Sequence, residues 1–415
     1  MVYHDEAMTE SRPAAVPEAA ASSLVVERVR ARPDARLIAL LALGHCVIDI
    51  NQGSLPAVLP FLKTAHRLSY AEAGAIVLVA NLTSSVIQPV FGYLADRAAR
   101  RWLLPVSVAT AGVGLGLTGV APGYWALLAL VLVMGLGVAA YHPEGYRTAT
   151  SVAGARKATA VSWFSLGGNV GLALGPPLLT TLVTTLGLPG SLGMVVPSLL
   201  VAAVLAAVLP LLGGPEGASP AAGRSASRGR TMPGAMALLV LVVTIRSWTQ
   251  LGFTTFVPFY YVDHLGADPR LVGPLLFVYL GAGALGTVVA GPVADRVGPL
   301  RYMRWALLAV TPLAVAFLLT SGGPLAFLTL ALFGGLLVSS FTISVVLGQA
   351  YLPRHAGMAS GLIVGFAIGT GGLGVTVLGW LADHWGLPAA LWASALLPLA
   401  GFVAALFLPR PREQA

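Results

Sequence analysis

Twelve apolar segments follow one another along this chain with short polar breaks between them, and this pattern restricts the possible folds more than any other feature. A helix needs roughly 20 mostly apolar residues to cross a bilayer. We expect spans at 37–62, 70–94, 102–121, 123–148, 157–184, 189–212, 235–262, 270–293, 303–321, 324–350, 356–381 and 387–408. The sequence therefore predicts an all-α integral membrane protein with twelve transmembrane helices embedded in the lipid bilayer.

The composition and the missing motifs exclude several functional classes. Only 10% of the residues are charged, whereas soluble domains carry about 25%. The sequence contains neither a G-x-x-x-x-G-K-S/T phosphate loop nor a D-D-x-x-D metal motif. We therefore expect neither ATP-driven transport on this chain nor a membrane-embedded transferase, and we predict that the protein is not an enzyme.

One long polar interruption divides the apolar segments into two sets of six. Residues 213–234 are rich in Gly, Ser, Pro and Arg, and this composition is typical of a flexible linker. We predict a disordered tail at 1–36, an N-terminal bundle at 37–212, a C-terminal bundle at 235–409 and a short tail at 410–415. The N-terminal tail lacks the apolar stretch of a signal peptide.

The net charge of +8 arises from basic residues that are concentrated in alternate loops. Lys and Arg accumulate on the cytoplasmic side of membrane proteins. The tails, the linker and the loops of one side carry Arg28, Arg30, Arg32, Arg36, Arg97, Arg100, Arg101, Arg147, Arg156, Lys157, Arg224, Arg228, Arg230, Arg296, Arg301, Arg304, Arg354, Arg410 and Arg412. We therefore place both termini in the cytoplasm of a multi-pass cell-membrane protein, and we interpret the basic charge as a topology signal and not as a nucleic-acid site.

A short motif occurs once in each half. The turn at 92–101, GYLADRAARR, recurs in kind at 291–301 as GPVADRVGPLR, between the second and third helices of each half. Glycine permits close approach of two helix ends, and the charges can pair or face a helix terminus. We predict a gate formed by Gly92, Asp96, Arg97, Arg101, Gly291, Asp295 and Arg296.

The first span contains polar residues that a simple membrane anchor would not need. His45, Asp49 and Gln52 are spaced so that they share one helix face, and Asn51 lies beside them. A charged residue at the bilayer centre costs about 3 kcal/mol or more, so such a face turns toward other helices or a wet cavity. We predict that Asp49 carries a proton, that His45 relays it, and that Asn51 and Gln52 contribute to a substrate site.

The fourth span contains the other intramembrane carboxylate, Glu144, with His142 nearby. Both residues are candidates for proton coupling, because histidine titrates near pH 6.5 and a carboxylate inside a span must be neutralised or paired. Alternatively, Glu144 forms a structural ion pair with Arg147, and the histidines are hydrogen-bonded core residues. The spacing of these groups matches no metal-ligand pattern, so we predict no metal site.

The seventh span contains the second half's one buried ion, Arg246. A guanidinium can bind an anionic substrate through two parallel hydrogen bonds. Alternatively, Arg246 neutralises Asp49 or Glu144, or it lies nearer the surface. The weaker candidates for a substrate site are Trp248, Gln250, Tyr260 and Gln349, since aromatic residues in a span are more often packing or interfacial residues.

Small residues are concentrated in the fifth span. Gly168, Gly171 and Gly175 precede Pro176 at helical spacing. Such residues allow close helix contact and bending. We predict that they pack the fifth helix against a neighbour.

Taken with the twelve spans and the linker, the repeated G-x-x-x-D-R turn resembles the major facilitator superfamily of secondary transporters. A closer resemblance, to the fosmidomycin resistance protein family, runs from about Leu37 to Pro409. It is carried by GHCVIDINQGSLPAVLP, AAYHPEGYR, GARKATAVSWFSLGGNVGLALGPPLL and GQAYLPRHAGMASGLIVGFAIGTGGLGVTVLGWLAD.

This resemblance implies a fold of two pseudo-symmetric six-helix bundles and export of a drug-like small molecule in exchange for protons. The expected energy source is a proton gradient with no cofactor, and we expect a monomer. Proton-coupled uptake of a metabolite by the same fold remains an alternative, as does a receptor or scaffold that transports nothing.

Overall fold

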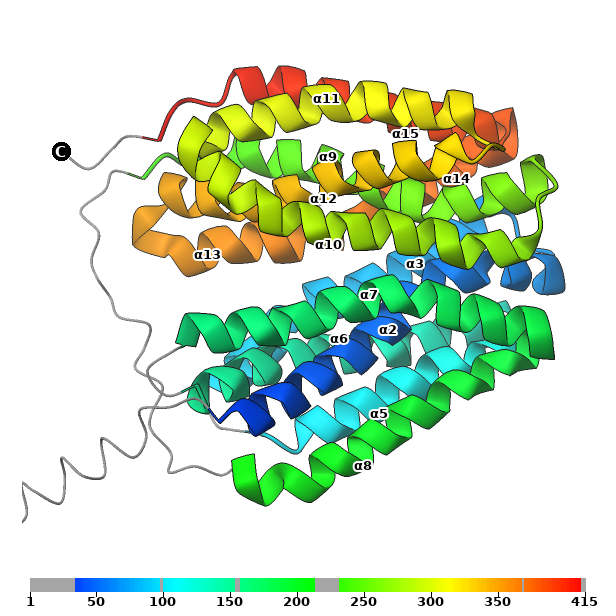
Figure 1. The fold of residues 1–415 in the computed structure, drawn as a ribbon, viewed down its shortest axis with the longest axis horizontal. Coiled ribbons are helices and arrows are strands. Elements are labelled where there is room, and N and C mark those ends of the chain that lie inside the picture. The colour runs from blue at the N-terminus through cyan, green and yellow to red at the C-terminus, as the bar shows by residue number, and fades with distance from the viewer. Residues whose placement is uncertain (1–33, 98–99, 154–156, 213–230, 368, 412–415) are drawn as a thin grey trace, which may run out of the picture.

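The computed structural model describes residues 34–97, 100–153, 157–212, 231–367 and 369–411, and the regular elements in these ranges are helical. Twelve of the described helices or helix combinations are long and apolar enough to span a membrane. Figure 1 shows that they form two bundles lying side by side, with the helix axes nearly along one direction. The predicted twelve-helix membrane fold is thus confirmed.

The first bundle contains the helices before the linker. Its elements are α2 (Ala35–His66), α3 (Tyr70–Asn81), η1 (Leu82–Val86), α4 (Gln88–Arg97), α5 (Leu103–Gly116), η2 (Leu117–Val120), α6 (Tyr124–Ser151), α7 (Lys157–Leu186), η3 (Leu188–Met194) and α8 (Val195–Leu212).

The second bundle contains the helices after the linker. Its elements are α9 (Pro233–Phe259), η4 (Tyr260–His264), η5 (Pro269–Leu271), α10 (Val272–Val297), α11 (Pro299–Thr320), α12 (Leu325–Tyr351), η6 (Pro353–His355), α13 (Ala356–Gly361), η7 (Leu362–Ala367), α14 (Gly371–Trp385) and α15 (Leu387–Leu406). The predicted tails and linker fall largely outside the described residues.

Helix α2 is closed at both ends by local interactions. The Asp34 side chain accepts hydrogen bonds from the backbone N–H groups of Arg36 and Leu37 at the N-terminus. At the other end Arg67 adopts φ 54°, and its N–H group bonds to the Lys63 carbonyl. Such caps satisfy backbone groups that the helix leaves unpaired.

Glycines of α7 allow it to pack directly on the backbone of α2. A Cβ atom at Gly171 would collide with the Cys46 carbonyl, and one at Gly175 would collide with the Ile50 carbonyl. In return, Gly53 of α2 faces the Leu172 carbonyl. Close backbone approach is how helices gain packing energy in lipid, where apolar burial alone gives little.

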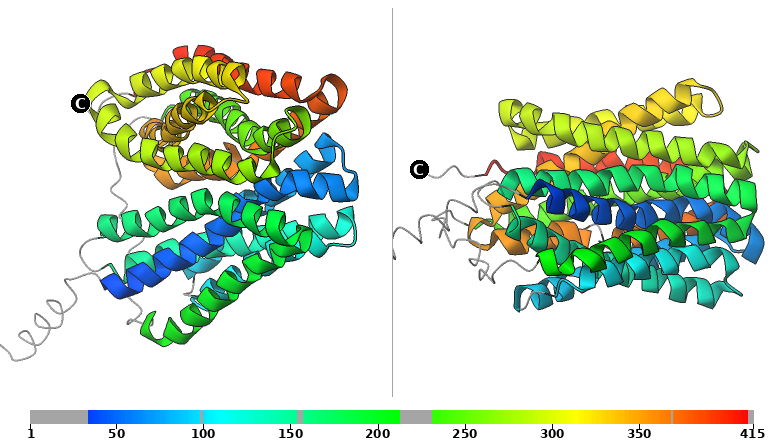
Figure 2. Two further views of the ribbon diagram at one scale, coloured as in Figure 1. Left: turned by 45° about the vertical axis from the view of Figure 1, so that its right-hand side comes forward. Right: turned by 60° about the horizontal axis from the view of Figure 1, so that its bottom comes forward.

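The two bundles meet through α3 and α14 and through α7 and α10. We call the end where α2 begins and α15 ends the terminal end, and the other the distal end. Figures 1 and 2 show the bundles side by side, and in Figure 1 their ribbons meet toward the distal end and separate toward the terminal end. At Gly379, a Cβ atom would lie 2.5 Å from the Tyr70 carbonyl oxygen across this contact.

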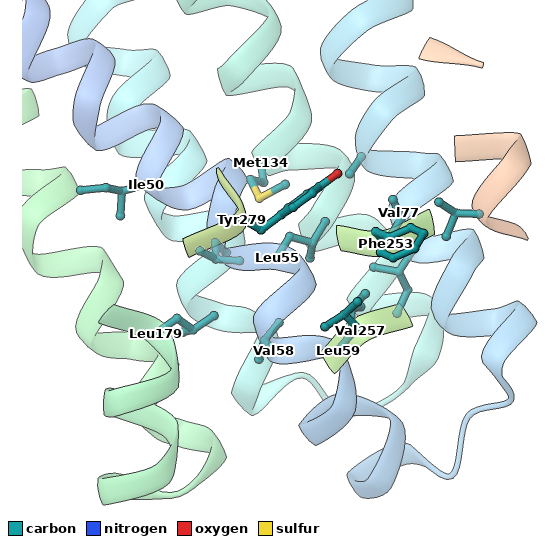
Figure 3. Packing of buried hydrophobic residues seen from close by; sticks show 14 of the residues in the cluster. Ile50, Leu55, Val58, Leu59, Val77, Met134, Leu179, Phe253, Val257 and Tyr279 are labelled. Carbon is teal, nitrogen blue, oxygen red and sulfur yellow. The ribbon is translucent and has the colours of Figure 1, made fainter. Parts of the chain in front are cut away.

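An apolar cluster joins the two bundles on the distal side of the polar face of α2. Figure 3 shows Leu55 and Leu59 of α2 close to Phe253 and Val257 of α9 and to Tyr279 of α10. These side chains are at most 3% exposed. They therefore pack across the interface between the two bundles on the distal side of the polar face of α2.

Two predicted spans are interrupted by π-helical turns that the apolar pattern does not predict. The span at 70–94 is divided by η1, and the span at 356–381 is divided by η7. In η1, the Thr83 hydroxyl donates to the carbonyls of Val79 and Ala80, and such side-chain bonds compete with the regular helix pattern. Because η1 and η7 contact each other across the two bundles, the irregular turns lie at the interface between the halves.

Candidate functional site

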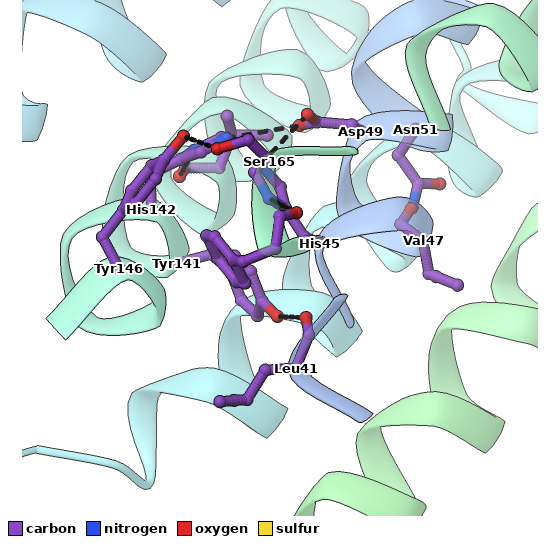
Figure 4. Close-up of polar contacts among 11 residues, drawn as sticks. Leu41, His45, Val47, Asp49, Asn51, Tyr141, His142, Tyr146 and Ser165 are labelled. Carbon is purple, nitrogen blue, oxygen red and sulfur yellow. Dashed lines mark hydrogen bonds and ion pairs between the residues drawn. The ribbon is translucent and has the colours of Figure 1, made fainter. Parts of the chain in front are cut away.

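Three of the four predicted proton-coupling residues lie together between α2 and α6. The Asp49 carboxylate has His45 Nε2 at 3.3 Å from Oδ2 and His142 Nε2 at 3.4 Å from Oδ1. His45 and Asp49 are 3% and 4% exposed. We call these three residues the His-Asp-His cluster (Figure 4).

The outer ring nitrogens of both histidines are held by backbone carbonyls. His45 Nδ1 lies 2.8 Å from the Phe164 carbonyl oxygen, and His142 Nδ1 lies 2.8 Å from the Val138 carbonyl oxygen. A carbonyl only accepts hydrogen bonds, so each Nδ1 carries the proton. Each Nε2 therefore faces Asp49 either as a lone pair, in the neutral ring, or as an N–H donor, in the imidazolium.

These fixed tautomers determine what the cluster can do chemically. When Asp49 is ionised and both rings are neutral, the Nε2 lone pairs face the lone pairs of the carboxylate oxygens. The negative charge of Asp49 is then buried without compensation. One proton on either Nε2 gives an attractive contact and a neutral cluster. The distances exceed the roughly 2.7–2.9 Å of a tight charge-assisted hydrogen bond, and Asp49 Oδ1 has no hydrogen-bond partner among the described residues. The arrangement is suited to taking up and releasing a proton.

Aromatic rings enclose the cluster on its terminal side. The Phe164 ring stacks on His45 with centroids 4.2 Å apart, and the Tyr141 hydroxyl donates to the Leu41 carbonyl at 2.8 Å. The Tyr146 hydroxyl lies 3.1 Å from the Ser165 hydroxyl. The side chain of His142 is 15% exposed, so this ring is the most accessible member of the cluster.

Gly168 of α7 packs against the His-Asp-His cluster. A Cβ atom there would lie 2.5 Å from His45 Nε2 and 2.6 Å from Asp49 Oδ2. The sequence prediction for Gly168, helix packing, therefore describes only part of its position, because this glycine also leaves room for the polar groups. Pro176 faces the other bundle, where its carbonyl would lie 3.3 Å from a Cβ atom on Gly273 of α10.

The ligand atoms of His45, Asp49 and His142 lie within 4.8 Å of one another, so the cluster could also hold one divalent cation. Sequence spacing did not indicate this arrangement, because the residues come from two helices nearly a hundred positions apart.

Glu144 does not join the cluster. Its carboxylate is fully buried and accepts long hydrogen bonds from Arg147 Nη1 at 3.5 Å and from the Thr148 hydroxyl at 3.4 Å. The backbone of Arg100 and the side chain of Arg101, both next to the first repeated turn, are near enough to interact with it. Glu144 is therefore arranged as in the alternative interpretation, an ion pair with Arg147, and it links α6 to the turn after α4.

Arg246 is buried in the second bundle and pairs with neither Asp49 nor Glu144. Its Nε donates to the Leu337 carbonyl and the Ser340 hydroxyl, and its Nη2 donates to the carbonyls of Leu337 and Val338. Within the described residues it forms no salt bridge, and Nη1 makes no hydrogen bond. The predicted burial of Arg246 is observed, and in this conformation it does not form the ion pair of the alternative interpretation.

The other residues predicted to bind substrate are scattered. Asn51 turns into the first bundle and donates to the Val47 carbonyl and the Ser198 hydroxyl. Tyr260 bonds to Ser321 at the distal end, and Gln349 bonds to Ser360 at the terminal end. The part-buried residues are Gln52, Trp248 and Gln250. The buried Nε1 of Trp248 has no partner in the described part of the chain.

The repeated turns lie at the terminal end. The side chains of Asp96 and Arg97 are outside the described residues, and Asp295 and Arg296 are exposed in the last turn of α10. The close approach expected at the glycines is not present. Among the described residues, a Cβ atom on Gly92 would have its nearest neighbour at 4.0 Å, and one on Gly291 would have none within 4 Å. In Figure 1 the ribbons of the two bundles lie apart at this end.

A polar network at the distal end was missed by the sequence reasoning. Lys63 Nζ lies 3.2 Å from Asp263 Oδ2, and the Tyr70 hydroxyl donates to the same oxygen at 2.9 Å. The Asp383 carboxylate accepts from the backbone N–H groups of Tyr70 at 2.8 Å and Ala71 at 2.9 Å. We call these five residues the distal latch, because each bond joins one bundle to the other.

The comparisons with known proteins agree with this architecture. The model of the Major Facilitator Superfamily matches residues 41–371. The Fosmidomycin resistance protein of Escherichia coli (strain K12) is 32% identical over 414 residues, which cover 98% of this chain and 100% of that protein. The uncharacterized MFS-type transporter YfnC of Bacillus subtilis (strain 168) is 32% identical over 378 residues, 89% of this chain and 92% of YfnC.

A solved structure supports the fold. A bacterial homologue of the human lysosomal transporter Spinster, in an inward-facing and occupied conformation, matches with a TM-score of 0.71 at 18% identity, over 91% of this chain and 97% of that chain. The predicted family and fold are both confirmed. This chain belongs to the major facilitator superfamily of membrane transporters and is similar, over nearly its whole length, to the fosmidomycin resistance protein.

Proposed function

We propose that this chain is an antiporter that exports a small, anionic, drug-like compound across the cell membrane in exchange for protons. The observation that carries the proposal is the His-Asp-His cluster, in which two imidazoles with fixed tautomers present Nε2 to one buried carboxylate. The proton gradient is the energy source, and no cofactor is required.

Proton exchange at this cluster follows from its charge. The formal charge is −1 without a shared proton and zero with one, and a buried uncompensated charge costs several kcal/mol. Binding one proton therefore lowers the free energy of the cluster far more when the cluster is closed off from water than when it is open to water. This difference couples protonation to conformation.

The basic loops support an orientation with both termini in the cytoplasm. In that orientation the distal end faces the outside, and the conformation described here is closed to the outside by the distal latch and the apolar cluster. The repeated turns then face the cytoplasm. Asp96 and Arg97 would hold that end closed through charge pairs and contact with a helix terminus.

Arg246 supports an anionic substrate. Arg246 is 3% exposed, and among the described residues it has no carboxylate partner and its Nη1 donates no hydrogen bond. The Ser247 hydroxyl and Trp248 Nε1, which follow Arg246 in α9, are also buried without partners in the described part of the chain. Buried polar groups without partners are unfavourable, and a bound ligand would satisfy them.

The proposed direction of transport rests on the similarity to the Fosmidomycin resistance protein, because export is the direction in which a transporter would confer resistance to a compound. Uptake by proton symport would use the same helices and the same cluster. A receptor or scaffold would move neither protons nor solute.

The test is a proton-flux assay in inside-out membrane vesicles with an acidic interior. Addition of a transported compound should collapse the preset pH gradient, and the compound should accumulate inside the vesicles. A compound that moves without changing the gradient would contradict proton coupling, and accumulation only in right-side-out vesicles would contradict export. Repeating the assay with a metal chelator present should give the same result, because the proposal assigns the cluster to protons and not to a cation.

A further inference from the structure

A groove on the outer face of the second bundle combines apolar walls with a basic end. It lies where α10 ends and α11 begins, with α12 behind it, and its volume is about 490 Å³. Its lining includes Val293, Val297, Arg301, Tyr302, Trp305 and Leu336. A volume of this size is typical of a small-ligand site.

The apolar walls of this groove are open to the bilayer. Val293 and Val297 are 39% and 42% exposed, and Trp305 is 68% exposed. The Tyr302 hydroxyl lies 2.6 Å from the Ser339 hydroxyl of α12, which holds the inner wall in place. An acyl chain is therefore the neighbour that these walls would contact. Trp305 lies within two turns of the start of α11, and tryptophan is a residue type that is enriched at membrane interfaces.

The terminal end of the groove is basic. Arg301 is exposed in the first turn of α11, which contains no acidic residue, and it forms no salt bridge among the described residues. Arg296 lies in the last turn of α10. The nearest acid in sequence, Asp295, is two positions from both Val293 and Val297, so helical spacing directs it away from the groove.

We propose that this groove binds an anionic phospholipid, with the phosphate at Arg301 and an acyl chain between α10 and α11. A basic residue at the headgroup level beside an apolar groove matches both parts of such a lipid, and each nearby Lys or Arg contributes about a fivefold preference for anionic headgroups. This site is separate from the His-Asp-His cluster and does not depend on the proposed direction or coupling of transport.

Native mass spectrometry of the full chain in detergent tests this site. The chain is incubated with phosphatidylglycerol and phosphatidylcholine of identical acyl chains. The wild type should retain phosphatidylglycerol with about a fivefold preference. Arg301→Gln should lower this preference toward one. Arg410→Gln, which removes an exposed arginine from the same end of the molecule but outside the groove, should not.

Two further experiments distinguish binding of the whole lipid from binding of its phosphate group alone. Val293→Trp fills the groove from its exposed rim without entering the core, and it should remove the tightest-held lipid. Inorganic phosphate at millimolar concentration should not displace that lipid. A wild type that retains both lipids equally, a preference that survives both Arg301→Gln and Val293→Trp, or displacement by phosphate alone would overturn the proposal.

Discussion

Lys63 Nζ and Asp263 Oδ2 lie 3.2 Å apart and join the two bundles at the distal end, although the residues are 200 positions apart in the sequence. Both side chains are about one-fifth exposed. Exposed ion pairs contribute about 0.2–1 kcal/mol, so this pair alone biases the closed distal end only modestly. The Tyr70 hydroxyl shares the same carboxylate and adds to the effect.

Asp263→Asn should raise the population that is open at the distal end by about two- to fivefold, since it removes the ion pair and weakens the Tyr70 hydrogen bond. Distances between spin labels placed on the distal ends of α3 and α14 would report this change. Arg270→Gln, which changes an exposed charge at the same end, is the matched control. Equal distance distributions in Asp263→Asn and wild type would contradict the latch.

Asp383 acts on the latch by a different interaction, because it caps the N-terminus of α3 from the other bundle. Loss of a helix cap costs about 0.5–2 kcal/mol. Asp383→Ala should therefore open the distal end more than Asp383→Asn, which keeps one side-chain oxygen as an acceptor. Cysteine labelling from the distal side measures the difference, and an identical labelling rate in the two variants would argue against capping.

These acids show where sequence reasoning reached its limit. Asp263 and Asp383 lie at the ends of spans, where an acidic residue is usually solvated, and nothing in the local pattern marks a partner about 200 or 310 positions away. By contrast, Asp49 and His45 could be selected from sequence, because a polar face in the middle of an apolar span is costly and needs a reason.

The convergence of His142 with Asp49 depends on the register of α6 against α2, which local sequence does not determine. The exclusion of Glu144 from the cluster depends on the same register, because Glu144 is two residues after His142 in α6 and therefore lies on another face. Twelve spans were predictable from hydropathy because bilayer thickness fixes their length. The π-helical turns η1 and η7 were not, because the apolar pattern of a span does not distinguish a π-helical turn from an α-helical one.

Gly168→Ala should damage the cluster, because the added methyl group would lie within 2.6 Å of both His45 Nε2 and Asp49 Oδ2. Overpacking of this kind costs about 1–3 kcal/mol. We expect a lower melting temperature in detergent and loss of proton-coupled transport. Gly281→Ala in α10 has its nearest neighbour at 3.9 Å and is the control. Unchanged coupling in Gly168→Ala would mean that the cluster tolerates displacement.

His142→Gln should slow proton exchange with the solution, because His142 is the most exposed member of the cluster. The expected result is about a hundredfold lower transport rate, the lower end of the range for loss of a positioned proton-transfer group, with substrate affinity unchanged. Rates from stopped-flow fluorescence and affinity from calorimetry separate the two quantities. A weaker affinity at an unchanged rate would instead place His142 in the substrate site.

The central claim is that the His-Asp-His cluster binds the exchanged proton through the negative charge of Asp49, and purified protein in liposomes tests it most directly. Asp49→Asn should insert normally, since a neutral amide is cheaper in the membrane than a carboxylate. It should still exchange substrate between equal concentrations, but it should not drive substrate uphill when a pH gradient is imposed. Glu144→Gln, the matched loss of the other intramembrane carboxylate, should remain coupled. Uphill accumulation by Asp49→Asn, or its loss in Glu144→Gln alone, would contradict the assignment of proton coupling to the His-Asp-His cluster.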